Sequence, residues 1–286
     1  MREGASLSTR CALIGDPAGH SLSPVIHRDG YRRLGLSWTY DAITVSPGDL
    51  EPFVNACLAD DSWAGLSVTA PHKEAIMSFG EPDHVSRLVG AGNTLVTHSG
   101  THSAVPTVHN TDVPGFVRAW RARGLGVPQT AAIVGNGATA RSLLVALAGL
   151  RVRSVVILAR DPARAAGAQQ LGIALGIDTV VQPLAFNLAP VDLVANTIPV
   201  AATVPYAQNW ADAAQWIFDA VYDPWPTPLG AAATEDHTVL TGLDLLAGQA
   251  VDQFHLFTGG AITFTNAHAA ALAELGRRTE NRTAEL

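Results

Sequence analysis

The chain is short of lysine, because 17 of its 18 Lys and Arg residues are arginine and only Lys73 is lysine. Arginine stays charged at every physiological pH, whereas an amine can exchange a proton once its surroundings move its pKa into range. A single lysine in an arginine-using chain therefore favours a proton-transfer role for Lys73. An ordinary surface lysine is the alternative.

Other shortages narrow the class of protein. The two cysteines, Cys11 and Cys57, form neither a disulfide framework nor a metal-binding spacing, so we expect a reduced, cytoplasmic protein without a metal site. No apolar run approaches the roughly 18 residues of a membrane span, and the start of the chain lacks the apolar core of a secretory signal. The net charge of −7, without a block of like charges, argues against nucleic-acid and membrane partners. The 286 residues give room for two domains.

The stretch around Lys73 has the pattern of a strand and the turn that follows it. Gly65–Thr69 is predicted to be a short strand, and Pro71 ends it. Lys73 then lies beyond the carboxyl end of the strand, where α/β sheets bind their ligands. The segments before it alternate between strand and helix patterns and predict an α/β domain: strands at 11–15 and 38–45, and helices at 25–34 and 50–58.

Two serines precede the first predicted helix. Ser23 stands before Pro24, the order typical of a helix N-cap followed by proline at the first helical position. Ser21 has no such duty, which leaves its hydroxyl for a ligand. Because hydroxyls and N–H groups at a helix start suit a carboxylate, both serines are candidate ligand-binding residues.

Two further polar residues stand out in the segment from 90 to 112, which reads as two strands joined by a turn at Ser99–Gly100. Asn93 is either a ligand-binding residue or a turn residue with left-handed backbone. Asp112 is either a functional carboxylate or the N-cap of the amphipathic helix that follows. We place a domain boundary near Asp112.

The second half of the chain opens with a strand at 130–135, a G-x-G-x-x-A loop at Gly135–Ala140, a helix to 150 and a strand at 154–158. Within one strand–helix–strand unit, this loop is typical of a dinucleotide-binding site, because its glycines permit a tight turn and the helix start supplies N–H donors to the pyrophosphate. An ordinary strand–helix turn is the alternative.

The residues after the next strand bear on the choice of coenzyme. Arg160, with Arg164, suits a 2′-phosphate, whereas Asp161 could instead accept hydrogen bonds from a ribose hydroxyl. Because Asp161 precedes Pro162, it is expected to cap the helix that runs to about residue 175. The pattern favours NADP over NAD.

The remaining segments predict a strand at 191–196 ending in Asn196 and Thr197, and a strand at 216–222 followed by a proline-rich connector. Tyr222 either reaches the site or packs against its neighbours. Two helices, 244–257 and 262–275, close the chain, and Gln249 faces either the site or solvent. Residues 276–286 are charged and are expected to fray.

Taken in order, these motifs closely resemble the shikimate dehydrogenase family, and the match runs from about residue 11 to 275. The segments that carry the resemblance are 15–24, Ser67–Lys73, Gly90–Thr94, Asn110–Asp112, the glycine loop and Tyr222–Pro228. The resemblance implies NADPH-dependent reduction of 3-dehydroshikimate to shikimate, a step towards chorismate and the aromatic amino acids. It also implies an α/β substrate domain built from 1–112 plus 243–286, and a Rossmann-type NADP domain at 113–242, in a monomer or homodimer.

The resemblance assigns roles residue by residue. Lys73 and Asp112 become the catalytic pair. The substrate carboxylate falls to Ser21, Ser23 and Tyr222, and the substrate hydroxyls to Thr69, Asn93 and Gln249. The cofactor residues are Gly135, Asn136, Gly137, Ala138, Thr139, Ala140, Arg160, Arg164, Asn196, Thr197 and Gly242.

The chain departs from the family pattern at several positions. The usual glycine before Asn110–Asp112 is absent, because Val108 and His109 precede Asn110, and Val113 replaces the glycine that follows. Asp161 replaces a threonine, and Asp244 replaces a glycine near the expected nicotinamide. Three alternatives remain: a quinate/shikimate dehydrogenase that uses NAD, another two-domain dehydrogenase such as a folate enzyme, and a non-catalytic NADP sensor. Ser23 and Arg160 argue against the first, the serine motif against the second, and the intact Lys73 and Asp112 against the third.

Overall fold

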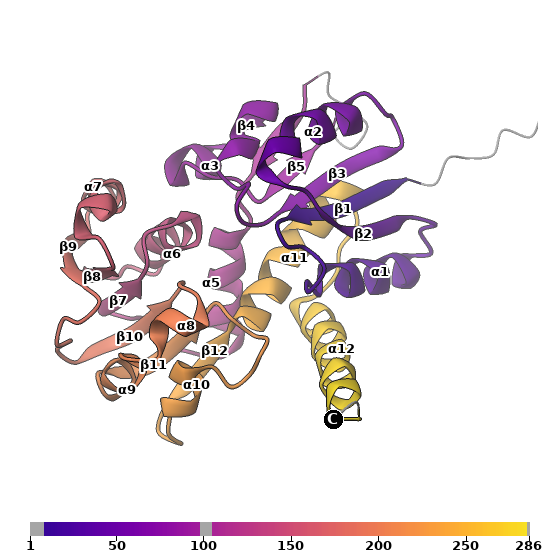
Figure 1. The fold of residues 1–286 in the computed structure, drawn as a ribbon. Coiled ribbons are helices and arrows are strands. Elements are labelled where there is room, and N and C mark those ends of the chain that lie inside the picture. Colours follow the sequence, from indigo (N-terminus) through magenta and orange to yellow (C-terminus); the bar gives the residue numbers. More distant parts are fainter. Residues whose placement is uncertain (1–8, 98–104, 285–286) are drawn as a thin grey trace, which may run out of the picture. The chain divides into compact units, whose positions relative to one another are not determined.

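The structure is a computed structural model, and it describes residues 9–97 and 105–284. The predicted turn at Ser99–Gly100 lies outside the described residues. The chain divides into two compact units: residues 1–111 with 249–286, and residues 112–248. Each unit contains one six-stranded sheet (Figure 1).

The sheet of the first unit has the strand order β2-β1-β3-β5-β6-β4. Strand β1 pairs in parallel with β2 and β3, while β5 is antiparallel to both β3 and β6. The strands are β1 (Arg10–Gly15), β2 (Thr39–Thr44), β3 (Trp63–Val68), β4 (Glu81–Pro82), β5 (Thr94–Val96) and β6 (Thr107–His109). The helices are α1 (Ser23–Leu34), η1 (Pro47–Asp49), α2 (Leu50–Leu58), η2 (Ala75–Phe79), α3 (His84–Val89), the second part of α11 (Gly242–Thr258) and α12 (Phe264–Ala284).

Helix α11 packs closely on the first unit because two glycines make room for its aromatic rings. A Cβ at Gly65 in β3 would overlap the ring of Phe257, and one at Gly30 in α1 would overlap the ring of Phe254. Both rings are buried. A second apolar cluster, which includes Ile14, fills the space between the sheet and α2. The sheet therefore holds the carboxyl ends of β1 and β3 at fixed places.

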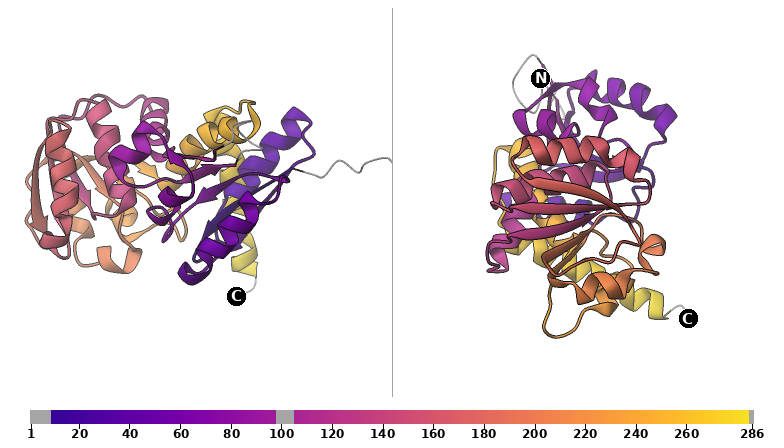
Figure 2. Two further views of the ribbon diagram at one scale, coloured as in Figure 1. Left: turned by 90° about the horizontal axis from the view of Figure 1, so that it is seen from above. Right: turned by 90° about the vertical axis from the view of Figure 1, so that its left-hand side faces the viewer.

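The sheet of the second unit is parallel throughout, with the order β12-β11-β10-β7-β8-β9 (Figure 2). This is the doubly wound order, and its topological switch point lies between β7 and β10, where such folds bind nucleotides. The strands are β7 (Thr130–Val134), β8 (Ser154–Ala159), β9 (Asp178–Pro183), β10 (Val191–Asn196), β11 (Ala214–Asp219) and β12 (Thr238–Thr241). The predicted α/β class with a Rossmann-type domain is confirmed.

The helices of the second unit are α5 (Asp112–Ala122), α6 (Ala138–Gly149), η3 (Pro162–Ala165), α7 (Ala166–Ala174), α8 (Val200–Thr203), α9 (Ala207–Asp212), α10 (Pro228–Ala232) and the first part of α11. Among these helices, α6 follows the glycine loop and α7 follows the cap at Asp161, as predicted. Strand β9 and helices α8 to α10 were not predicted. Within the described residues, none of the helices combines the length and the hydropathy that a membrane crossing needs.

Two predictions about element ends are wrong. Residues 276–284 are helical and not frayed, because α12 continues to Ala284, while residues 285–286 lie outside the described residues. The strand predicted to reach Tyr222 ends at Asp219, because the Asp219 side chain accepts a hydrogen bond from the Val221 N–H at 3.1 Å and turns the chain there.

Candidate active site

The loop before α1 contradicts the predicted N-cap at Ser23. Helix α1 begins at Ser23, and its N-cap is Leu22, which makes no side-chain cap. Ser21, rather than Ser23, caps the backbone, because its Oγ accepts the Ser23 N–H at 3.1 Å. The Ser21 hydroxyl also donates to the Ser23 Oγ at 3.2 Å. The prediction for Ser23 missed this because both serines precede Pro24 within three residues.

Lys73 lies in the turn after β3, as predicted, and the turn is fixed from both sides. The His72 ring is buried and bonds the Val45 carbonyl oxygen at 2.7 Å. The Lys73 carbonyl accepts the Gly92 N–H at 2.8 Å, which joins the turn to the segment that carries Asn93. Thr69 N–H donates to the Ile14 carbonyl at 2.9 Å, so the end of β3 stays paired with β1. Lys73 is half-buried on this rigid turn.

Asn93 is the centre of a buried hydrogen-bond network, not a turn residue with left-handed backbone. Its Oδ1 accepts the Thr111 N–H at 2.8 Å and the hydroxyls of Thr111 and Thr94 at 3.0 and 3.1 Å. Its Nδ2 donates to the Gln249 Oε1 at 3.2 Å. Gln249 is only 6% exposed, so the solvent-facing alternative is wrong. The network joins β5, the segment that follows β6, and α11 around Asn93 and Gln249, two of the predicted hydroxyl-binding residues.

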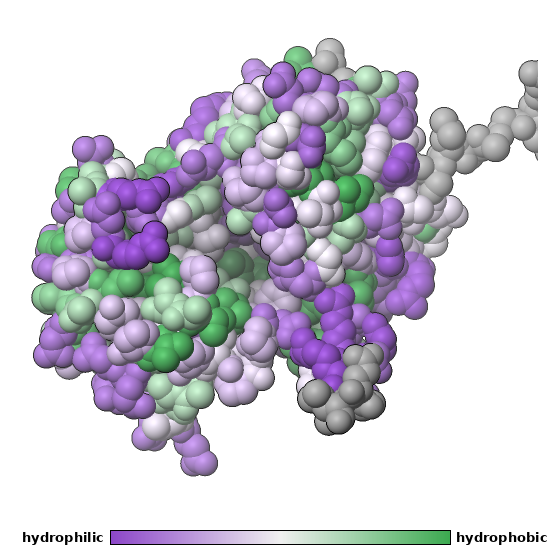
Figure 3. Space-filling view, in the orientation of Figure 1, coloured by the Kyte–Doolittle hydropathy of each residue, from purple (hydrophilic) through white to green (hydrophobic). Residues whose placement is uncertain are grey.

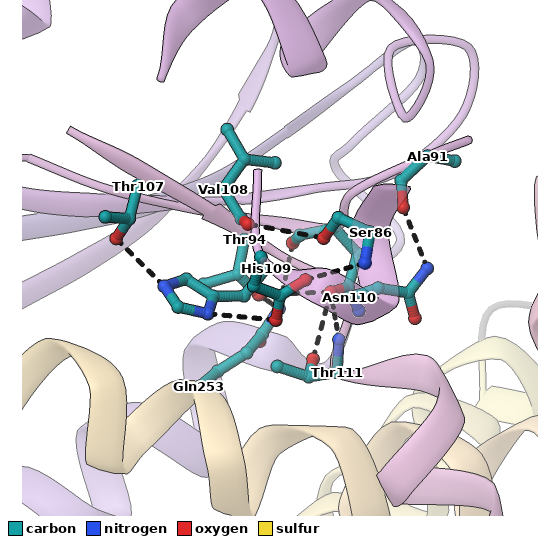
Figure 4. Close-up of polar contacts among 11 residues, drawn as sticks. Ser86, Ala91, Thr94, Thr107, Val108, His109, Asn110, Thr111 and Gln253 are labelled. Atoms are coloured by element: carbon teal, nitrogen blue, oxygen red, sulfur yellow. Dashed lines mark hydrogen bonds and ion pairs between the residues drawn. The ribbon is translucent and has the colours of Figure 1, made fainter. Parts of the chain in front are cut away.

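One helical turn beyond Gln249, Gln253 extends the same network and was missed by sequence reasoning. Its Nε2 donates to the Asn93 carbonyl and to the Thr94 Oγ1, both at 3.0 Å (Figure 4). Its Oε1 accepts from the Ser67 hydroxyl at 2.9 Å, and Ser67 accepts from Tyr40 at 2.6 Å. The signal available in the sequence was the i, i+4 spacing of two glutamines, which places both on one helix face.

His109, which stands just before Asn110, is bonded at both ring nitrogens. Nε2 lies 2.9 Å from the Thr107 Oγ1 and Nδ1 lies 3.2 Å from the Asp83 Oδ2 (Figure 4). The other oxygen of Asp83 caps α3 by accepting the Ser86 N–H at 2.6 Å. Next along the chain, Asn110 donates to the Ala91 carbonyl at 3.0 Å. The imidazole therefore fastens the strand that leads into Asp112.

Asp112 is the first residue of α5 and is 5% exposed. The division between the two units falls between Thr111 and Asp112. Thr111 is held by Asn93, so the backbone entering Asp112 is fixed at the edge of the first unit.

In the second unit, the glycine loop has the geometry of a phosphate cradle. Gly135 follows β7 directly and has φ +110, and a Cβ there would overlap the Thr197 hydroxyl. Gly137 is the N-cap of α6, so the N–H groups of Ala138, Thr139 and Ala140 belong to the first helical turn. Such N–H groups have no acceptor within the helix and suit an anion.

The residues after β8 confirm the predicted cap. Asp161 Oδ1 accepts the Ala163 N–H at 3.1 Å. Arg160 and Arg164 are exposed, and the Arg164 carbonyl accepts from the Asn136 side chain at 2.8 Å. This bond links the glycine loop to the segment that carries both guanidinium groups. The N–H groups that suit a phosphate and the two cations are therefore held next to each other.

Asn196, a predicted cofactor-binding residue, has a fully buried side chain at the end of β10. Its Nδ2 donates to the Asp219 Oδ1 at 2.9 Å and its Oδ1 accepts the Ile198 N–H at 3.2 Å. Burial raises the pKa of Asp219, although hydrogen bonds from Thr227 (2.6 Å), the Val221 N–H and Asn196 lower it. Asp219 thereby anchors the connector that carries Tyr222, which is half-buried.

Gly242 and Asp244 open α11. A Cβ at Gly242 would overlap the Ala220 carbonyl oxygen, so this position needs glycine. Asp244, the residue that departs from the family pattern near the expected nicotinamide, is 1% exposed. Its Oδ1 accepts two hydrogen bonds from Arg123, from Nη2 at 2.7 Å and from Nε at 3.0 Å. Its Oδ2 accepts the Thr241 N–H at 2.8 Å. The carboxylate is therefore engaged inside the second unit.

Replacement of Arg123 by alanine is expected to lower the free energy of unfolding by about 2–3 kcal/mol, because it leaves the buried Asp244 carboxylate without its cation. The value is set below that of a fully buried pair because the Arg123 side chain is 42% exposed. Urea denaturation measures it. Arg121→Ala, an exposed neighbour on α5, is the control and should change stability by less than about 0.5 kcal/mol. In the Arg123→Ala/Asp244→Gly double variant the loss should shrink, and additive losses would contradict the pairing.

Comparison with known proteins gives concordant results. Residues 13–95 match the family model described as the shikimate dehydrogenase substrate binding domain. The shikimate dehydrogenase (NADP(+)) of Moorella thermoacetica is 34% identical over 265 residues, covering 87% of each chain. The crystal structure of Mycobacterium tuberculosis shikimate dehydrogenase is 35% identical, with a TM-score of 0.83 over 93% of this chain and 99% of that one. A Thermus thermophilus shikimate 5-dehydrogenase in complex with NADP(H) and shikimate is 28% identical, with a TM-score of 0.80 and coverage of 93% and 99%.

Proposed function

This chain belongs to the shikimate dehydrogenase family, and from that premise we propose that it catalyses the reversible NADPH-dependent reduction of 3-dehydroshikimate to shikimate. The observation that carries the proposal is the buried network around Asn93. In this network, the two candidate substrate residues Asn93 and Gln249 are hydrogen-bonded to one another, and Thr111 bonds both of them.

The first unit supplies groups that match a polyhydroxylated carboxylate. Ser21 and Ser23 present two hydroxyls at the start of α1, where the helix dipole favours a negative charge. We assign these two serines, with Tyr222, to the substrate carboxylate. Thr69, Asn93 and Gln249 are assigned to its hydroxyls, because amides and hydroxyls both donate and accept hydrogen bonds.

The second unit fits NADP. The Gly135 cradle and the first turn of α6 suit the pyrophosphate, and Arg160 and Arg164 suit a 2′-phosphate. Two further residues are assigned to the cofactor. Thr197 lies against Gly135 in the cradle, and Gly242 is the first residue of α11. Asn196 fixes the end of β10 that carries Thr197. Bound NADPH supplies the hydride in this chemistry.

Lys73 and Asp112 are proposed as the catalytic pair. In the reducing direction a proton must reach the oxygen of the reduced ketone, and Lys73 is the donor we assign, with Asp112 orienting the amine and the hydroxyl. Arginine cannot replace the donor because its guanidinium does not release a proton. The rigid turn made by His72 and Gly92 keeps Lys73 in place.

The direct test is oxidation of shikimate by the purified protein, followed by the appearance of reduced nicotinamide. We expect turnover with NADP and a lower kcat/KM with NAD, and a lower kcat/KM for quinate than for shikimate. Higher kcat/KM for quinate with NAD would instead identify a quinate/shikimate dehydrogenase. Binding of NADP without any turnover would identify a sensor.

Replacement of Arg160 by alanine is expected to raise KM for NADP by about ten- to a hundredfold, because a charged hydrogen bond to the 2′-phosphate is lost. KM for NAD should change by less than about twofold, since NAD lacks that phosphate. Arg153→Ala, an exposed arginine before β8, is the control. Equal effects on both coenzymes would remove Arg160 from 2′-phosphate recognition.

We further propose a cytoplasmic enzyme that works as a monomer or homodimer. Its two cysteines are free and buried, as suits a reducing compartment. Size-exclusion chromatography with light scattering distinguishes the two assembly states.

A further inference from the structure

The end of the C-terminal helix α12 is bonded to the loop that carries Ser21. Arg278 Nη1 donates to the His20 carbonyl at 2.7 Å, and Nη2 donates to the Ser21 carbonyl at 3.3 Å. Both bonds lie within the first unit. The helix segment that sequence composition suggested would fray is thus anchored on the candidate carboxylate-binding loop.

Arg278 is itself held in place by Glu274, one helical turn earlier. The Glu274 Oε1 accepts from Arg278 Nε at 2.9 Å and from Arg277 Nη2 at 2.7 Å, and Oε2 accepts from Arg277 Nε at 2.8 Å. The hydrogen bond from Arg277, together with that from Arg278, lowers the pKa of Glu274 to about 2. The Arg278 side chain is 27% exposed and that of Arg277 is 60% exposed. Hydrophilic side chains cover this end of α12 (Figure 3).

The two carbonyl bonds fix the direction of the loop's peptide groups. In a trans peptide the carbonyl and the following N–H point in opposite directions. With the carbonyls of His20 and Ser21 turned towards Arg278, the N–H groups of Ser21 and Leu22 point away from it. Inside the loop, the Ser21 N–H bonds the Ala18 carbonyl at 3.0 Å and the Ser21 Oγ holds the Ser23 N–H. The loop therefore has little freedom while Arg278 is bound.

The charge of the cluster also favours an anion. Two guanidinium groups share one carboxylate, so the group formed by Arg277, Arg278 and Glu274 keeps a net charge of +1. This charge lies beside the start of α1, where the helix dipole already favours a negative ligand.

We propose that Arg278 is a positioning residue for substrate binding. It holds the backbone of His20 and Ser21 so that the hydroxyls of Ser21 and Ser23 are arranged for the substrate carboxylate before it arrives. The role rests on the proposed function, because it concerns the site assigned there to the carboxylate. A residue that only positions the ground-state site contributes to binding and little to the chemical step.

Arg278→Ala is expected to raise KM for shikimate about tenfold or more, the loss typical of a charged hydrogen bond, with kcat within about threefold and KM for NADP unchanged. Arg278→Lys keeps the charge and one donor and should recover part of the loss. Arg277→Ala removes the same unit of charge from the cluster but no bond to the loop. Because the Arg277 side chain is 60% exposed, solvent screens its charge, and KM should rise much less than in Arg278→Ala, by about threefold at most.

Amide hydrogen exchange of the peptide spanning residues 16–26 provides a second measurement that does not need activity. Exchange should be faster in Arg278→Ala than in Arg277→Ala and the wild type, because the loop loses its anchor. A wild-type protein without shikimate turnover would overturn the proposed function alone, while this exchange comparison would still test the anchor. The inference about Arg278 is overturned if the two alanine variants show equal KM, or if loop exchange does not change.

Discussion

Replacement of Lys73 by alanine should lower kcat for shikimate oxidation by about a thousandfold, within the range contributed by a single general acid or base, while KM for shikimate changes by less than about tenfold. The physical reason is that the amine acts on a proton that moves only in the chemical step, so its loss removes stabilisation of the transition state more than binding of the ground state. The measurement is initial-rate kinetics with NADP in both variant and wild type.

Lys73→Arg is an informative second variant, because it separates the positive charge of the side chain from its ability to release a proton. It keeps a cation on the turn fixed by His72 and Gly92, but the guanidinium cannot trade a proton. We expect it to bind shikimate within about threefold of the wild type and to turn over nearly as slowly as Lys73→Ala. His84→Gln, a substitution at an exposed position of the same unit, is the control and should keep the wild-type kcat and KM. Normal turnover in either Lys73 variant would remove this amine from the mechanism.

The sequence predicted those features of the site that depend on local chemistry. The glycine loop after β7, the cap at Asp161 and the turn carrying Lys73 all follow from residues within one short segment. The order of strands and helices around the loop was sufficient for the Rossmann-type sheet. These signals are reliable because a glycine, a proline or a short polar side chain acts on its own backbone.

The features that the sequence did not predict depend on distant partners. Gln249 and Gln253 are buried because α11 returns to the first unit, and no local pattern separates that case from an exposed helix face. From the sequence, Asp244 is a departure from the family pattern near the cofactor, and only the structure pairs it with Arg123. The extension of α12 is likewise stabilised by contacts with the loop at His20, more than two hundred residues away. Tertiary contacts of this kind override local propensity.

The first unit should lose stability in mild acid because of His27, a fully buried histidine on α1. Its ring stacks on Tyr40 at a centroid distance of 4.2 Å and lies beside Phe254 and Phe257. Within the described part of the chain, no contact to either ring nitrogen has full hydrogen-bond geometry. Burial lowers the pKa of His27 to about 3 and outweighs the hydrogen-bonding side chain of Gln253 nearby, which raises the pKa. The folded protein therefore keeps this ring neutral at pH values well above 3.

The sign of the effect follows from proton binding in the two states. Above the unfolded-state pKa of about 6.5 the ring is neutral whether the chain is folded or not, and its titration contributes nothing to stability. As the pH falls below that value, the unfolded chain binds a proton that the folded chain does not, so stability falls until the pH reaches the folded-state pKa. One pKa unit corresponds to about 1.4 kcal/mol, so we expect a loss of about 2 kcal/mol at pH 5 and about 3 kcal/mol at pH 4 from this residue.

His27→Gln tests this expectation, because glutamine has a similar size and no titration in this range. Its free energy of unfolding, measured by urea denaturation between pH 4 and 7.5, should fall less steeply with acid than that of the wild type, by about 2 kcal/mol at pH 5. His84→Gln, at an exposed position on α3, should keep the wild-type slope. Parallel curves for the wild type and His27→Gln would mean that the ring is protonated in the folded state, and the apolar packing around it would then have to hold a charge. That outcome conflicts with the cost of burying an unpaired cation among Tyr40, Phe254 and Phe257, so the slope decides whether this aromatic cluster is closed to protons.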